Sequence, residues 1–182
     1  MRTPQSHFRF IKRLLGFGCL LNMTFASPMS GGSSLGSEIK QDDPTVRVDY
    51  DGALGLLRQQ LNDDKLGRAE VLHVSRHWVF RTNVSSQQME KQYDYRLSIR
   101  AAGKSDAVRE LISTLARVTP EHSGMVADLR WGCIIYAENG SRLFSVFFDK
   151  AGLRGVVNGA CVNFGNEALR EWAEQFFQQA FQ

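Results

Sequence analysis

The sequence has no hydrophobic run long enough to cross a membrane, little cysteine, and no excess of positive charge in its predicted mature part. A membrane-spanning helix needs about 20 apolar residues, and the apolar stretch at residues 14–25 is shorter. Removing residues 1–26 leaves 18 of the 22 Lys and Arg (22 minus 4) against all 19 Asp and Glu, a net charge near −1. The basic footprint of a nucleic-acid-binding protein is therefore absent, and we predict no nucleic-acid partner.

The chain also lacks the motifs of several common chemistries. After Asp149 the segment FFDKAGLRGVVNGACVNF offers no alternating oxygen ligands for calcium and no Lys-Ser/Thr for a phosphate loop. No Gly-x-Ser-x-Gly elbow occurs. His73 and His77 would stand about 13 Å apart on a strand, too far for one zinc. We predict no catalytic set, cofactor or metal, although acids distant in sequence could still be brought together by folding.

The first residues have the pattern of a secretory signal peptide. Four basic residues precede an apolar core, and small residues surround a cut after Ala26. Cys19 lies in GFGC, where Gly16 and Phe17 depart from a lipoprotein-processing box. We therefore predict an exported protein, periplasmic or secreted, with no lipid on Cys19.

The remaining chain divides into a leader and one domain. Residues 27–45 are rich in Ser and Gly and predict a flexible leader. Residues 46–182 hold enough apolar residues for one core. Apolar spacing predicts a helix after a capping Asp51, a second after a capping Ser105, and a long amphipathic C-terminal helix after Asn166.

Alternating apolar and polar residues predict the strands of a first hairpin, and short apolar runs on either side of a turn predict those of a second. Residues 69–84 and 92–101 form one antiparallel hairpin across a polar loop, and residues 129–137 and 142–148 form another across Asn139-Gly140. Further turns at Gly152 and Asn158-Gly159 extend the second hairpin into a meander. The fold class is thus α+β, with helices packed on an antiparallel sheet.

The two cysteines of the mature chain, Cys133 and Cys161, leave a disulfide open. Pairing across the turns sets Cys133 opposite Val146 and Cys161 opposite Val156, on the other face and two strands away. A flat meander would hold them about 14 Å apart, beyond the roughly 7 Å that a disulfide allows between Cα atoms. A bulge or a folded-over last strand could still bring them together.

Two surfaces point to a partner. The hairpin around Asn139-Gly140 is apolar on both faces, so one face needs the C-terminal helix and the other the first helix, a second subunit or another protein. The polar residues of the first hairpin lie on one face, which is rich in His and Arg and has Asp94 as its one acid. This face suits an acidic partner through charge complementarity. The alternative is an ordinary solvated face. The candidate partner-binding residues are His73, His77, Arg81, Arg96, Arg100, Tyr136 and Phe147.

A small exported domain without a catalytic set favours a non-catalytic binding protein. We predict a protein-binding or inhibitory domain of the immunity type in a bacterial periplasm, with a protein partner or a second copy of itself. This step uses a general expectation about small exported domains. The alternatives are an envelope hydrolase with a non-local acid–base site and a carrier of small apolar ligands.

Overall fold

The computed structural model describes residues 49–75, 83–101, 105–125 and 127–181. The predicted signal peptide and leader, with Cys19, lie outside these ranges, as do His77 and Arg81. Within them, the elements in chain order are α1 (Tyr50–Asn62), β1 (Leu66–His73), α2 (Ser86–Lys91), β2 (Tyr95–Arg100), α3 (Asp106–Leu115), β3 (Pro120–His122), β4 (Leu129–Ala137), β5 (Arg142–Asp149), β6 (Arg154–Val157), β7 (Ala160–Phe164) and α4 (Ala168–Ala180).

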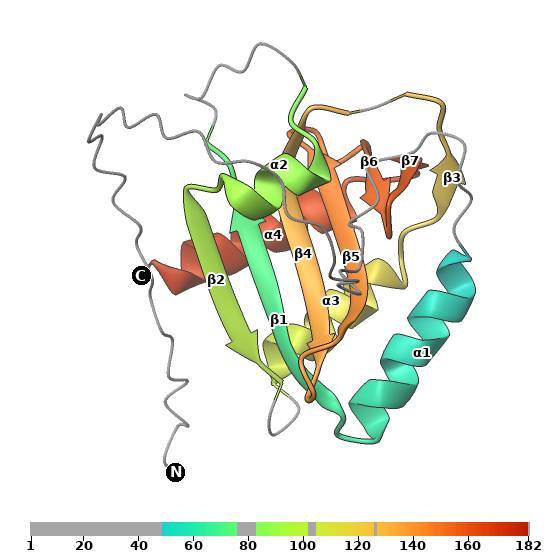
Figure 1. The fold of residues 1–182 in the computed structure, drawn as a ribbon, viewed down its shortest axis with the longest axis vertical. Coiled ribbons are helices and arrows are strands. Elements are labelled where there is room, and N and C mark those ends of the chain that lie inside the picture. The colour runs from blue at the N-terminus through green and yellow to red at the C-terminus, as the bar shows by residue number, and fades with distance from the viewer. Residues whose placement is uncertain (1–48, 76–82, 102–104, 126, 182) are drawn as a thin grey trace, which may run out of the picture.

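The strands form one antiparallel sheet in the order β2-β1-β4-β5-β6-β7-β3 (Figure 1). Both predicted hairpins and the meander are present, and β4 has the predicted bounds. The first strand differs, since β1 covers Leu66–His73 where residues 69–84 were predicted, and β3 was not predicted. The predicted α+β class, with a C-terminal helix on an antiparallel sheet, is therefore confirmed. The predicted loop between β1 and β2 is different, because it contains α2. A capping box, in which Ser85 and Gln88 bond each other's backbone amides, starts this short helix.

The two Asn-Gly turns have different geometries. Asn158 and Gly159 both have positive φ, 48° and 89°, which is the two-residue hairpin turn that the sequence predicts. At the β4–β5 turn only Gly140 does, at 83°, and Asn139 accepts hydrogen bonds from the amide and hydroxyl of Ser141 instead. The hairpin prediction is confirmed there, but its turn type was wrong, because the Asn139 side chain closes a longer loop.

The helix caps also differ in detail from the prediction. Asp49, not Asp51, caps α1, since its Oδ1 accepts from Gly52 N at 2.9 Å. Ser105 occupies the N-cap position of α3 without a side-chain hydrogen bond. Asn166 precedes the N-cap of α4 but still accepts from Ala168 N at 3.1 Å, so it satisfies one amide of the first turn.

The sheet separates two buried clusters. The side that we call the helix face packs against α1, α3 and α4, and its strand residues include Val71, Leu97, Cys133, Phe144 and Phe148. The side that we call the open face carries α2 at one end (Figure 1) and buries the smaller cluster, with Leu72, Met89, Ile134, Phe147 and Cys161. The β4–β5 hairpin, which is apolar on both faces, is thus covered on both faces by other parts of the same chain. A second subunit or another protein is not needed to bury it.

The cysteines lie on opposite faces of the sheet. Cys133 pairs with Val146 and Cys161 with Val156, in the predicted registers. Both side chains are buried, Cys133 in the cluster of the helix face and Cys161 in that of the open face. No disulfide joins these two residues of the described chain. Burial raises the pKa of the Cys133 thiol.

Candidate functional site

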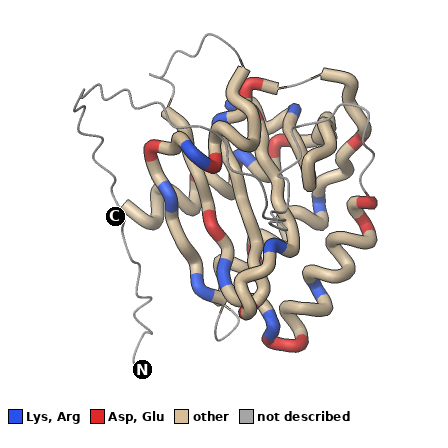
Figure 2. The backbone as a smooth tube through the Cα atoms, in the orientation of Figure 1, with Lys and Arg blue, Asp and Glu red and all other residues tan. Residues whose placement is uncertain are grey.

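Three arginines and a tyrosine stand in one row across four strands of the open face. Arg100 of β2 lies opposite Arg68 of β1, Arg68 opposite Tyr136 of β4, and Tyr136 opposite Arg142 of β5. Residues directly opposite each other point to the same face of a sheet. We call Arg100, Arg68, Tyr136 and Arg142 the arginine row. Figure 2 shows basic positions along β1 and β2.

Irregular pairing helps to position the row. The β1–β4 ladder shifts register between Leu66 and Arg68, and the β4–β5 ladder shifts between Ile135 and Tyr136. Such bulges twist the strands locally and redirect side chains. Both register shifts lie next to residues of the arginine row, so the sheet is irregular where these side chains gather.

A buried carboxylate supports the row from the next position along β1. Glu70 is 4 % exposed, and its Oε1 accepts from Arg68 Nε at 2.9 Å and from Arg96 Nη2 at 2.5 Å. Both arginine side chains remain 40 % exposed. A buried charge needs hydrogen-bonded partners. Glu70 therefore holds two guanidinium groups in place at the surface and is itself withdrawn from it.

Two tyrosines complete the arrangement. The Arg68 guanidinium carbon lies 4.1 Å from the centre of the Tyr136 ring, and that of Arg96 lies 5.9 Å from the Tyr93 ring. Both contacts are within cation–π range. Burial raises the pKa of Tyr136, and the nearby Glu70 adds to the effect. Burial alone would lower the pKa of Arg96, but Glu70 and Tyr93 raise it overall. The tyrosines thus restrict the arginines to defined positions.

The far end of the row is tied to α2. Arg142 Nη1 bonds Glu90 Oε1 at 2.8 Å, with 34 % of the Arg142 side chain exposed. Between the row and α2 lies a cleft of about 210 Å³. It is lined by Glu70, Leu72, Glu90, Tyr93, Arg96, Ile134 and Tyr136. Around this cleft stand four arginines, Arg68, Arg96, Arg100 and Arg142, and two glutamates, Glu70 and Glu90. The local charge is therefore positive.

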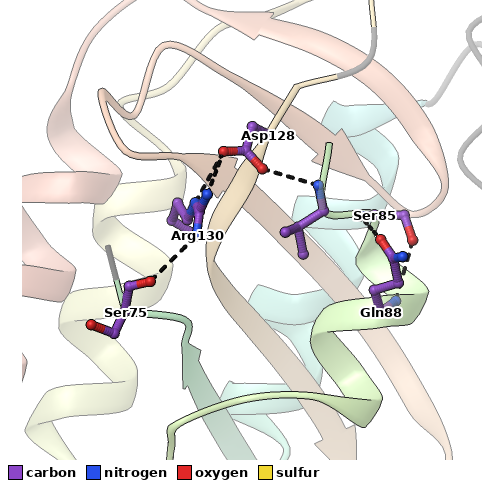
Figure 3. A network of polar contacts seen from close by, with 6 residues as sticks. Ser75, Ser85, Gln88, Asp128 and Arg130 are labelled. Atoms are coloured by element: carbon purple, nitrogen blue, oxygen red, sulfur yellow. Dashed lines mark hydrogen bonds and ion pairs between the residues drawn. The ribbon is translucent and has the colours of Figure 1, made fainter. Parts of the chain in front are cut away.

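A polar network holds the cover of the open face (Figure 3). Asp128 Oδ1 accepts from Val84 N at 3.0 Å, and Asp128 Oδ2 from Arg130 Nη2 at 2.7 Å. Arg130 Nη1 in turn donates to the carbonyl of Ser75 at 3.3 Å. The network joins the end of β1 and the residues before α2 to the start of β4. It therefore fixes the entry to α2 and, through α2, the position of Glu90.

The structure gathers some of the predicted partner-binding residues and separates others. Arg96 and Arg100 share one face of β2, as predicted, and the pairing of the strands brings Tyr136 onto the same open face. His73 does not, because it pairs with Tyr95 and so points to the helix face, where its ring lies 4.1 Å from that of Trp131. Phe147 is on the open face but only 1 % exposed, so it belongs to the core. Neither residue therefore joins the exposed arginines, and its role in binding a partner stays a prediction.

The pairing of β1 with β2 explains why His73 lies apart from Arg96. The sequence analysis placed the polar parities of the two strands on one face without assigning a register. The observed register sets Leu72, not His73, opposite Arg96, so His73 points to the other face. Arg68, Glu70 and Arg142 were missed for the same reason, since they become neighbours only through pairing. The available signal was the placement of Arg68 and Glu70 two residues apart in β1, which puts both on one face.

A second cleft, of about 170 Å³, lies between α3 and α4. Its lining includes Asp106, Glu110, Trp172 and Phe176. Among the described residues, no three His, Cys, Asp or Glu are grouped to hold a metal ion. No described helix is both long and apolar enough to span a membrane.

Comparisons with protein-family models, curated proteins and solved structures found no match to this chain.

Proposed function

We propose that the protein is an exported binding domain that holds an acidic surface of a protein partner on its arginine row. The observation that carries this proposal is the row itself, in which Arg68 and its neighbour Arg96 are positioned by a buried Glu70. Arginine is the preferred cation at interfaces because its planar guanidinium group can donate two parallel hydrogen bonds to one carboxylate. An acidic partner would therefore meet groups that are already in place.

Preorganisation favours binding over a merely solvated surface. Cation–π contacts and ion pairs restrict Arg68, Arg96 and Arg142 before any partner arrives. Restricting such side chains in advance lowers the entropy lost on association, which is roughly 0.5–1.5 kcal/mol for each flexible side chain. Charge complementarity also speeds encounter and selects against basic partners.

The inhibitory or immunity-type role is supported by the predicted signal peptide and leader together with this surface. A small exported domain that presents a fixed cationic face could cap an acidic region of an envelope enzyme. Neither alternative has an observation of its own. The clefts described above, at about 170 and 210 Å³, are smaller than the roughly 300–1,000 Å³ typical of ligand pockets, so neither of them favours the carrier. Glu70 is engaged by two arginines, and nothing about it favours a hydrolase.

The test is affinity capture from the native envelope with matched baits. The mature wild-type domain, an Arg100→Glu/Arg142→Glu variant and an Arg109→Glu control are immobilised in parallel. Arg109 is an exposed arginine of α3, remote from the row. We expect a stoichiometric acidic partner that the wild type and the control retain and the row variant loses. Its affinity should fall at least about tenfold in the row variant, and by a similar factor in high salt.

Two results would contradict the proposal. One is a partner that binds the row variant and the wild type equally well, since the row would then not be the contact surface. The other is a purified wild-type domain that turns over an envelope substrate and retains no acidic partner. Circular dichroism of the three baits confirms that each is folded.

A further inference from the structure

The arginine row ends at β2, a strand that has no pairing partner on its outer side among the residues that the structure describes. Among the described residues, β2 pairs with β1 alone and forms one edge of the sheet. It has six residues, twice the length of β3 at the opposite edge. It contains no proline, the residue that often blocks an edge. An edge of this length can accept another strand through main-chain hydrogen bonds.

The register shows which backbone groups point outward. Ala101 N donates to the carbonyl of Gly67 at 3.1 Å, which sets the phase of the β1–β2 ladder. Hydrogen-bonded pairs alternate along an antiparallel ladder. Leu97 and Ile99 therefore direct their N–H and C=O groups to β1, whereas Arg96, Ser98 and Arg100 direct theirs to the open edge. The two arginines thus offer backbone and side-chain contacts to the same incoming strand.

The other side of the edge is apolar. Tyr95, Leu97 and Ile99 point to the helix face. There the Phe181 ring lies 5.6 Å from that of Tyr95 and is 50 % exposed. The side chains of an added strand that point to the helix face would cover Phe181. It would thus meet arginines on one side and aromatic rings on the other.

We propose that the acidic partner binds as an extended segment that adds an antiparallel strand to the open edge of β2. This inference rests on the proposed function and specifies its mode. The segment carries Asp or Glu at two positions four residues apart, opposite Arg96 and Arg100, with a small polar residue opposite Ser98. Apolar residues between them lie against the helix face, because successive strand side chains alternate.

Charge argues against a second copy of this chain at the same edge. If two β2 strands paired about Ser98, Arg96 of one copy would lie opposite Arg100 of the other. Like charges directly opposite each other destabilise a sheet. Pairing about any other residue of β2 would still gather four arginines from the two strands at one seam. An acidic strand meets no such repulsion, so the arginines select for it.

The probe is a synthetic peptide with the predicted pattern, Thr-Thr-Glu-Val-Thr-Val-Glu-Thr-Thr. Its affinity for the mature domain is measured by fluorescence anisotropy, beside the same peptide with Lys in place of Glu. Ser98→Pro removes the outward N–H and leaves the arginines and the β1 ladder in place. We expect roughly tenfold weaker binding to this variant, from a lost hydrogen bond and an obstructing ring, and less than about twofold change for Ser98→Thr.

Methylated peptides give a readout that does not depend on how the variant folds. Methylation of the central Thr nitrogen, which points to β2, should weaken binding about tenfold, whereas methylation of a Val nitrogen, which points away, should have little effect. Amide exchange at Arg96, Ser98 and Arg100 should slow when the peptide binds.

The outcomes separate the two proposals. Strand addition is overturned if binding depends on the arginines but is unaffected by methylation of the peptide and leaves amide exchange unchanged. The proposed function is then still supported. A peptide that fails to bind also overturns strand addition. A wild-type dimer that Ser98→Pro dissolves would mean that a second copy occupies the edge. An envelope partner that is indifferent to the row variant overturns the proposed function itself.

Discussion

The two faces of the sheet use the same strands for different purposes. On the helix face, α1, α3 and α4 bury a continuous layer of aliphatic and aromatic side chains. On the open face, α2 covers only one end, and beyond it the charged side chains of β1, β2 and β5 begin. Burying apolar surface contributes about 25 cal/mol per Å², whereas exposed ion pairs contribute little. The helix face should therefore carry most of the stability and the open face the recognition.

The largest effect should come from the helix face. Phe148 is fully buried, and its ring stacks 6.5 Å from that of Trp131. Phe148→Ala should lower the free energy of unfolding by about 3–5 kcal/mol in urea titrations, because it leaves a cavity. Partner binding at temperatures where the variant stays folded should be unchanged. A loss below about 1 kcal/mol would mean that this layer is not the main core.

The cover of the open face should matter less, but measurably. Met89 of α2 is fully buried against the smaller cluster. Met89→Ala should cost about 2–3 kcal/mol, in the lower part of the range for buried methionine, because α2 can settle toward the sheet. Hydrogen exchange should show faster opening of α2 than of β4. If Met89→Ala is neutral, α2 does not cover the face, and the doubly apolar hairpin again needs a partner.

Removing the charge of Glu70 sharpens the comparison within the open face. Glu70→Gln should reduce stability by about 1 kcal/mol, since the two arginines that it bonds are partly exposed and screened. Binding of an acidic peptide should stay the same or strengthen, because the Gln oxygen can still accept from Arg68 and Arg96 and hold them in place while a negative charge beneath the row is gone. A loss of binding as large as that in the Arg100→Glu/Arg142→Glu variant would instead mean that hydrogen bonds to an uncharged group cannot position the arginines.

The last effect concerns the helix face and arises only at alkaline pH. Because burial raises the Cys133 pKa in the folded protein, only the unfolded thiol loses its proton as pH passes its ordinary value of about 8.5. Stability from this residue is thus complete below that pH and decreases above it, by about 1.4 kcal/mol for each further unit. Cys133→Val should flatten this decrease in denaturation curves between pH 8 and 10. Parallel curves for the two proteins would contradict the assignment.

The sequence was informative where a pattern is local. The short apolar run LRWGCIIYA and the Asn158-Gly159 pair determine β4 and the tight turn between β6 and β7, because a short strand and a turn with positive φ depend on a few neighbouring residues. The capping box at Ser85 was equally local, but the helix that follows is too short to show a periodic stripe. The arginines Arg96 and Arg100 could be assigned to one face of their strand for the same reason.

The composition of the candidate site was decided by tertiary structure. Arg68, Tyr136 and Arg142 come from three strands, and a change of one residue in any ladder would scatter them over both faces. The sequence by itself determined the fold class, the bounds of β4 and the presence of cationic residues on β2. Only the register of β1 against β2 and β4 placed His73 with the aromatic core and Glu70 beneath the arginines, because pairing across a sheet depends on contacts between segments that are far apart in the chain.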